Sequence, residues 1–252
     1  MSERQGIVVV RDECRASVTL SRPEKGNALS ASLIEELDRA IRTAVQGKSR
    51  LLVIDGAGKH FCTGFDLSDI ESESDATLLL RFVRIEAVLQ MVHSLPIASI
   101  AIGRGRCYGA GADLFAACET RVALRGAQFA FPGSGFGLVL GTARLASLVG
   151  RDAARRLALS GKPIGAEEAL GIGLVTAILE TEEQIGQLIA DEAAKVARVD
   201  ERTAAMLRSQ ISVADDDRAL AALVRSAARP GLKERVRGYV ERVASERRAA
   251  TA

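Results

Sequence analysis

Tryptophan is absent from the sequence, and other aromatic residues and histidines are scarce. Aromatic residues make up 4% of the 252 residues, which is too few for the stacking platforms of proteins that bind single-stranded nucleic acid. The formal net charge of +2 argues against a general nucleic-acid binder, which would carry a concentrated basic face. Because His60 and His93 are the only histidines, a zinc site is not expected. We therefore expect neither a nucleic-acid partner nor a bound metal.

Long apolar runs and paired cysteines are also missing. No apolar run approaches the roughly 20 residues that a membrane span needs. The start, MSERQGIVVV, is too briefly apolar for a signal peptide. The four cysteines, at positions 14, 62, 107 and 118, show no CxxC spacing. We therefore expect a cytoplasmic protein with reduced thiols and no membrane partner.

The first half of the chain alternates strand-like and helix-like segments, and the rest is helical. The patterns predict strands at 6–10, 16–20, 51–55 and 96–102, and helices from Ser30 onward, at 76–93 and at 111–118. Strand signals stop near residue 140, and helices are expected at 141–149, 151–160, 166–171, 182–197, 200–212, 217–228 and 232–248. The chain is therefore predicted to hold an α/β core over 1–195 and a helical C-terminal region over 196–252.

A glycine-rich stretch, GRGRCYGAGADLFAACE at residues 103–119, joins an expected strand to an expected helix. One interpretation is a dinucleotide-binding turn, because Gly103, Gly105 and Gly109 form GxGxxxG. That interpretation, a redox enzyme, is weakened because no acidic residue closes a following strand about 20 residues later. A second interpretation is structural, with Asp113 stabilising the first turn of a helix through the free N–H groups there.

A third interpretation depends on a partner stretch, LLVIDGAGKHFCTGFDL at residues 51–67, which again places glycines and a loop after a buried strand. Two such turns on adjacent parallel strands can aim two backbone N–H groups at one point. A donor pre-aimed at a developing oxyanion is worth on the order of 3 kcal/mol in a transition state. Asp113, one helical turn beyond, would then exchange a proton beside that oxyanion.

Several stretches together resemble the crotonase superfamily, the enoyl-CoA hydratase/isomerase group. They are LSRPEKGNALS (20–30), VIDGAGKHFCTGFDLSDI (53–70), the glycine-rich stretch 103–119 and GRDAARRLALSGKPIGAEEALGIGLVTAIL (150–179). The resemblance implies an α/β, crotonase-like spiral of ββα units with a helical C-terminal trimerisation region. It implies a homotrimer or dimer of trimers, and an acyl-CoA thioester as substrate. Coenzyme A is then part of the substrate, and no separate cofactor or metal is implied.

Carried over by position, the resemblance assigns roles to individual residues. The backbone N–H groups of Phe65 and Ala110 become the two oxyanion donors, and Asp113 takes the place of the first catalytic glutamate of hydratases. Lys25 falls in the stretch that contacts the adenine and pantetheine part of the ligand. The other expected substrate-binding residues are Ala28, Gly64, Asp66, Leu67, Gly109, Gly133 and Lys233. From the residues alone, a helix cap at Asp66 and solvated lysines at positions 25 and 233 remain alternatives.

The chain departs from the hydratase pattern after Pro132, where Gly133 replaces a second glutamate. Adding water across a double bond is best done by two carboxylates, so Asp113 stands as the single evident acid/base. Hydration or double-bond isomerisation is expected. Hydrolysis or decarboxylation of an acyl-CoA and a non-catalytic CoA-ester binder remain alternatives. Whether another carboxylate, such as Glu86 on the long helix, replaces the missing one is left open.

Overall fold

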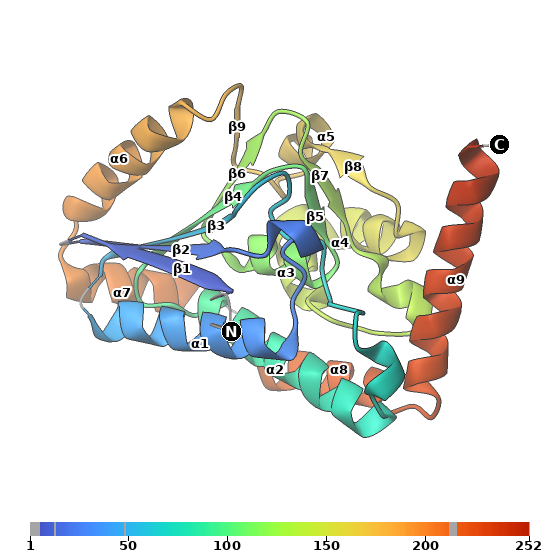
Figure 1. Ribbon diagram of the computed structural model, residues 1–252. Coiled ribbons are helices and arrows are strands. Elements are labelled where there is room, and N and C mark those ends of the chain that lie inside the picture. Colours follow the sequence, from blue (N-terminus) through green and yellow to red (C-terminus); the bar gives the residue numbers. More distant parts are fainter. Residues whose placement is uncertain (1–5, 13, 48, 212–215, 252) are drawn as a thin grey trace, which may run out of the picture.

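The structure, a computed structural model, describes residues 6–12, 14–47, 49–211 and 216–251. Within these residues, strands form a larger sheet in the order β1-β2-β3-β4-β6-β9 and a smaller one in the order β5-β7-β8. Helices pack below the larger sheet, and α6 (Gln184–Ala197) lies across its opposite face (Figure 1). The fold is therefore a layered α/β arrangement, as the strand and helix patterns predict.

The larger sheet contains the strands that the sequence marks most clearly. Its members are β1 (Ile7–Arg11), β2 (Arg15–Leu20), β3 (Leu51–Gly56), β4 (Ala98–Gly103), β6 (Thr120–Leu124) and β9 (Ala177–Leu179). The first two form an antiparallel hairpin, and the remaining neighbours are parallel. Helices cover both faces around β3 and β4, which explains why these two strands are nearly continuous apolar runs.

The expectation that strands stop near residue 140 is wrong. The smaller sheet consists of β5 (Arg106–Tyr108), β7 (Gln128–Ala130) and β8 (Ile164–Gly165). β8 pairs with β7, and β9 pairs with β6, so both late strands extend sheets begun much earlier. Segments of two or three residues are too short to show an alternating pattern, and pairing distant in sequence is what makes them strands.

The remaining helices follow the apolar periodicity closely. They are α1 (Ala31–Gln46), α2 (Asp75–His93), α3 (Ala110–Ala117), α4 (Thr142–Ser160), α5 (Ala166–Gly171), α7 (Glu201–Ile211), α8 (Asp216–Ala227) and α9 (Leu232–Thr251). Ser30 caps α1 as predicted, because its hydroxyl accepts from the Leu33 N–H at 3.2 Å. The two helices expected at 141–149 and 151–160 meet at Gly150, whose φ of 77° is not helical. Residue 212, in the helix expected at 200–212, and residues 1–5 lie outside the described residues.

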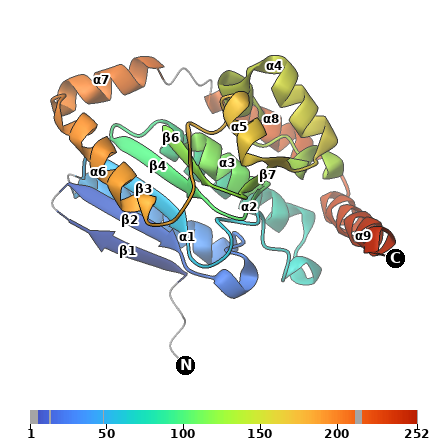
Figure 2. The same cartoon turned by 90° about the horizontal axis from the view of Figure 1, so that it is seen from above.

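α9 stands at one end of the molecule, away from α6 and α7 (Figure 2). Its first turn is fixed by the Asp75 carboxylate of α2, which accepts from the N–H groups of Gly231, Leu232 and Lys233 at 2.9, 3.1 and 2.8 Å. The next turns pack against the short 3-10 helix η3 (Pro132–Phe136). The boundary predicted between residues 195 and 196 falls inside α6 and stays a prediction. Among the described helices, none is long and apolar enough to cross a membrane.

Candidate active site

The two glycine-bearing turns meet beside the carboxyl ends of β3 and β4. The Tyr108 N–H donates to the Cys62 carbonyl at 3.0 Å, which joins the loop after β3 to β5. Gly111 makes the close approach possible, because a Cβ there would stand 2.7 Å from the Cβ of Cys62. Gly64 has a φ of 99° and no room for a side chain against the Tyr108 carbonyl. Glycine is therefore required on both sides of the junction.

The backbone N–H groups predicted to bind an oxyanion lie on the two sides of this junction. In the described part of the chain, no acceptor bonds the N–H of Phe65 or of Ala110. Their neighbours are paired, since the Gly64 carbonyl accepts from the Leu29 N–H at 2.7 Å and the Gly109 N–H donates to the Ala130 carbonyl at 2.8 Å. Both residues line one cavity. This arrangement can receive a ligand oxygen from two sides.

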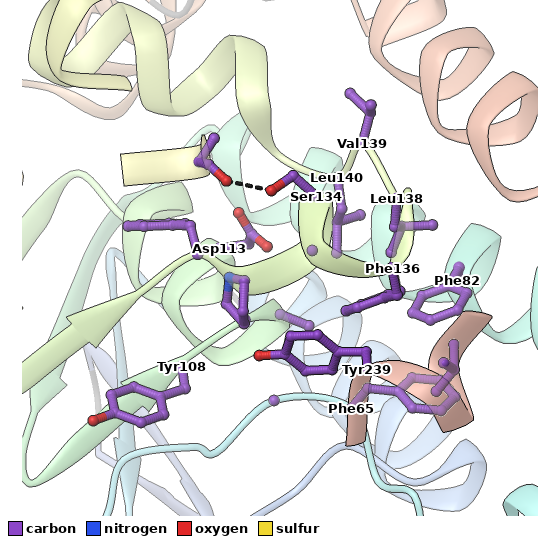
Figure 3. Close-up of a pocket in the computed structure, with 18 of the residues that line it drawn as sticks. Phe65, Phe82, Tyr108, Asp113, Ser134, Phe136, Leu138, Val139, Leu140 and Tyr239 are labelled. Carbon is purple, nitrogen blue, oxygen red and sulfur yellow. Dashed lines mark hydrogen bonds between the residues drawn. The ribbon is translucent and has the colours of Figure 1, made fainter. Parts of the chain in front are cut away.

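Asp113 lies in the first turn of α3, and its carboxyl group reaches the middle of the same cavity (Figure 3). The side chain is 6% exposed, and none of the described residues donates a hydrogen bond to its oxygens. Burial raises the pKa of this carboxyl well above its usual range, the nearby Arg144 lowers it, and Glu86 raises it further. A proton acceptor with a raised pKa is a stronger base once it is ionised.

The cavity has a volume of about 450 Å³ and is predominantly apolar. Asp113 is the only charged side chain among the described residues that line it. The aromatic side chains of the wall are those of Phe65, Phe82, Tyr108, Phe131, Phe136 and Tyr239. The whole chain holds seven phenylalanines and two tyrosines, so most of its aromatic residues are gathered here. Such a wall suits an apolar group better than a polar one.

Four of these aromatic residues form a continuous row along the cavity (Figure 3). Phe65 stacks on Phe82 with ring centroids 4.6 Å apart, and Phe82 lies 6.4 Å from Phe136. Tyr239 of α9 continues the row at 5.3 Å from Phe136. Further α9 residues in the wall are Val236, Val240, Val243 and Ala244. The C-terminal helix therefore forms part of the cavity and does not merely lie beside it.

Most of the predicted site residues come together at this cavity. Its lining includes Gly64, Phe65, Leu67, Gly109, Ala110, Asp113 and Gly133. Lys25, Ala28, Asp66 and Lys233 are not part of the lining. Asp66 pairs with Arg22 at 2.8 Å and accepts from the Ser68 N–H at 3.0 Å. The structure thus places the two groups of residues apart, and the binding roles of both stay predictions.

The two predicted cations lie outside the cavity lining and make other contacts. Lys25 and Asp66 line a separate polar hollow of about 370 Å³, where the Lys25 ammonium lies 3.5 Å from the Ser68 hydroxyl. The Lys233 ammonium donates to the Glu71 carbonyl at 2.6 Å. Neither lysine lines the cavity, and the contact of each with a phosphate-bearing ligand stays a prediction.

Sequence reasoning missed the partner of Glu86 and the contribution of α9. Glu86 does not enter the space beside Gly133, because it is 1% exposed and bound by both Nη atoms of Arg144. A Cβ at position 133 would stand 3.3 Å from the Leu138 carbonyl, so a side chain there would need a small shift of that loop. The spacing of Val236, Tyr239 and Val240 in α9 was a signal for a buried face, but it did not indicate what that face covers.

Comparisons with known proteins agree with this architecture. The sequence profile of the enoyl-CoA hydratase/isomerase family matches residues 12–229. A protein of Mycobacterium bovis named probable enoyl-CoA hydratase is 36% identical over 175 residues, which cover 68% of this chain and 70% of the relative. The short-chain-enoyl-CoA hydratase of Clostridium acetobutylicum is 30% identical over 187 residues, covering 72% and 71%.

Solved structures confirm the predicted fold class. A Bordetella parapertussis protein described as an enoyl-CoA hydratase/isomerase superposes with a TM-score of 0.92 and 43% identity, covering 94% of this chain and 99% of that one. The enoyl-CoA hydratase of Bacillus halodurans, at 22% identity and a TM-score of 0.82, supports the fold alone. The α/β, crotonase-like fold with a helical C-terminal region is thereby confirmed, while trimerisation is a separate matter.

Proposed function

Because the chain belongs to the enoyl-CoA hydratase/isomerase family, we propose that it moves a double bond within an acyl-CoA thioester, with Asp113 as the only acid/base. Asp113 has the only charged side chain among the described residues that line the cavity, and the proposal rests on this observation. Isomerisation needs one group that first takes and then returns a proton. Hydration needs one group to activate water and another to protonate the α-carbon.

The proposed reaction proceeds in two balanced steps. The Asp113 carboxylate takes a proton from the α-carbon of a 3-enoyl thioester, and the electron pair of that C–H bond moves toward the thioester oxygen. The N–H groups of Phe65 and Ala110 stabilise the resulting dienolate oxygen. The protonated Asp113 then returns the same proton to the γ-carbon, which leaves a 2-enoyl thioester. No water and no separate cofactor is consumed, because coenzyme A stays attached throughout.

Substrate turnover tests this proposal directly. The purified protein is given 3-enoyl-CoA and 2-enoyl-CoA thioesters of several lengths, and products are separated by liquid chromatography before mass spectrometry, because the two isomers have the same mass and differ in retention time. We expect conversion of 3-enoyl to 2-enoyl-CoA that falls by about 100-fold or more in Asp113→Asn. A product heavier by one water from 2-enoyl-CoA would instead indicate hydration, and free coenzyme A would indicate hydrolysis. Binding without any turnover would favour the non-catalytic binder.

The oxyanion donors are tested by removing one N–H without removing a side chain. Ala110 is the first residue of α3, a position where proline is tolerated because its missing N–H is not needed by the helix. We expect Ala110→Pro to lower kcat by about 100-fold or more. Ala110→Gly keeps the N–H and is the matched control. A loss in both variants, with a lowered thermal midpoint, would indicate disturbed packing and not a lost donor.

The acyl group, assembly and location complete the proposal. The apolar, largely aromatic wall supports an acyl chain without polar groups at its far end.

Assembly into homotrimers or dimers of trimers is supported by exposed apolar side chains on α7, where Met206, Leu207 and Ile211 are 61%, 51% and 77% exposed. Sedimentation velocity would test that assembly. A cytoplasmic location stays a prediction from the cysteine pattern.

A further inference from the structure

A buried ion pair joins α2 and α4, the two helices that pack against α3, which carries Asp113. Arg144 donates from Nη1 to Oε1 of Glu86 at 2.9 Å and from Nη2 to Oε2 at 2.6 Å. The two side chains are 3% and 1% exposed. Gln90 fixes the carboxylate further, because its amide donates to Glu86 Oε1 at 3.1 Å and to the Asp216 carbonyl at 2.9 Å. Neither charge can turn away to solvent.

The pair and Asp113 come from three helices packed side by side. Glu86 lies on α2, Asp113 on α3 and Arg144 in the first turn of α4, and α3 packs against both of the others. Gly141, the residue before α4, has no room for a Cβ because that atom would lie 2.7 Å from Asp113 Cγ. The backbone at the start of the helix that carries Arg144 therefore packs against the Asp113 carboxyl group.

Stability alone is a poor reason for this ion pair. Moving two charges out of water is costly, and replacing such a pair by apolar residues of the same size is often neutral or stabilising. The Nε atom of Arg144 is also buried and has no hydrogen-bond partner among the described residues, which adds to the cost. A pair retained under these conditions is more readily explained by its effect on the group beside it.

We propose that Glu86 and Arg144 are positioning residues for Asp113, whose opposite charges together set how readily its carboxyl group releases a proton. The inference rests on the proposed role of Asp113. Glu86 disfavours the Asp113 carboxylate and Arg144 favours it, and the low-dielectric interior strengthens both effects. With both present the effects oppose each other, and burial remains the largest influence on the carboxyl group.

Few other ionisable groups face Asp113. Besides Glu86 from α2 and Arg144 from α4, the cavity lining contributes the phenol groups of Tyr108 from β5 and Tyr239 from α9. His93 lies at the end of α2, where Arg144, Asp216 and Arg121 act on it and burial lowers its pKa. Because its pKa is lowered, the His93 imidazole is neutral near pH 7 and does not mask the effect of the pair.

Single and double variants test the direction in which each charge shifts the pH dependence of kcat/KM. In Glu86→Gln, the unpaired guanidinium favours the Asp113 carboxylate, so the rise of kcat/KM with pH moves to lower pH by about one unit or more. In Arg144→Gln, the favourable charge is lost, so the rise moves to higher pH. The double variant removes both charges, and its profile returns to within about half a unit of the wild type.

A second measurement keeps the test independent of turnover and of folding losses. The Asp113 carboxyl is titrated by ¹³C NMR on aspartate-labelled protein, with Asp113→Asn identifying its signal. The double variant keeps matched shapes and no unpaired charge, so it stays folded if a single variant does not. Asp55→Asn is the control, since it breaks a partly buried pair with Arg104 at 2.7 Å outside the cavity lining.

The outcomes distinguish a failure of the positioning role from a failure of the proposed reaction. Opposite shifts of the NMR titration in the two single variants support the positioning role even if no thioester turns over, in which case only the proposed reaction fails. Shifts in the same direction, or lowered thermal midpoints with an unchanged titration in the single and double variants, overturn it. In that event the ion pair serves packing alone.

Discussion

Gly141, the residue that precedes α4, touches Asp113 of α3. A Cβ at position 141 would overlap Asp113 Oδ1 and stand 2.7 Å from its Cγ, and the φ of Gly141 is 63°. The bare backbone before α4 therefore forms one side of the space in which the Asp113 carboxyl group lies. Its position depends on the absence of a side chain at residue 141.

We expect Gly141→Ala to lower kcat by at least about tenfold, because the new methyl group displaces the Asp113 carboxyl from its seat. The substitution also places alanine at a positive φ, which costs about 1 kcal/mol or more of stability. Gly126→Ala is the control, since Gly126 has a φ of 84° and nothing within 4 Å of its Cβ position. Equal losses of kcat in both variants would assign the effect to backbone strain.

Alanine at position 111 is expected to separate the two proposed oxyanion donors, Phe65 and Ala110. Its Cβ would stand 2.7 Å from Cys62 Cβ, so the loop that carries Phe65 must move away from α3. We predict a lower kcat together with a lower thermal midpoint, measured by turnover and by calorimetry. Gly186→Ala lies in α6 with open space around it and should raise stability by up to about 1 kcal/mol. Unchanged turnover in Gly111→Ala would contradict the assignment.

The raised pKa of Asp113 predicts a specific dependence of stability on pH. Because the native carboxyl holds its proton more tightly than the unfolded one, its contribution is fully present below the unfolded value of about 3.9. That contribution is lost as pH rises toward the raised native pKa. Asp113→Asn does not ionise, so it should be more stable than the wild type at pH 8 and nearly equal at pH 4. Each unit of pKa shift corresponds to about 1.4 kcal/mol.

Denaturant unfolding of both proteins across this pH range measures the difference. Changes common to both, such as protonation of other carboxylates, cancel in the comparison. A difference that stays constant with pH would mean that Asp113 titrates normally in the folded protein.

Phe136 lies between Phe82 and Tyr239 in the aromatic row, at 6.4 and 5.3 Å. We expect Phe136→Leu to raise KM for long or ring-bearing acyl-CoA thioesters by about 2- to 10-fold, the range expected for losing an aromatic contact. KM for a four-carbon acyl-CoA and kcat for all substrates should change little. Steady-state kinetics over a series of acyl lengths tests this, and an equal change for every length would place the acyl chain elsewhere.

Sequence patterns were enough for the parts of the fold that are regular over several turns or strands. The apolar run from Leu51 to Ile54 predicted a buried strand, and the apolar spacing after the capping residue Ser30 predicted a helix. The pairing of Ile164 with Phe129 could not be predicted, because a two-residue strand has no sequence pattern of its own. Their strand geometry comes from partners far along the chain.

The candidate site also contains some residues that the sequence predicts and some contacts that it does not predict. Asp113 was singled out because glycines and a carboxylate stand close together in sequence after a strand, and the resemblance to the crotonase superfamily added Gly64 and Ala110. The contact of Gly141 with Asp113, and of Arg144 with Glu86, joins residues on separate helices. Long-range packing creates such contacts, and a single sequence carries no local signal for them.

The aromatic row ends on a helix that holds none of the proposed reacting groups. α9 is tied to α2 by one carboxylate, Asp75, and from there Val236, Tyr239 and Val240 close the cavity. Under the proposed function, substitutions along this one helix can change which acyl chains fit while the strands and turns around Asp113 stay as they are. Over evolutionary time, the 20 residues of α9 can then diversify the substrate range without rebuilding the proposed chemistry.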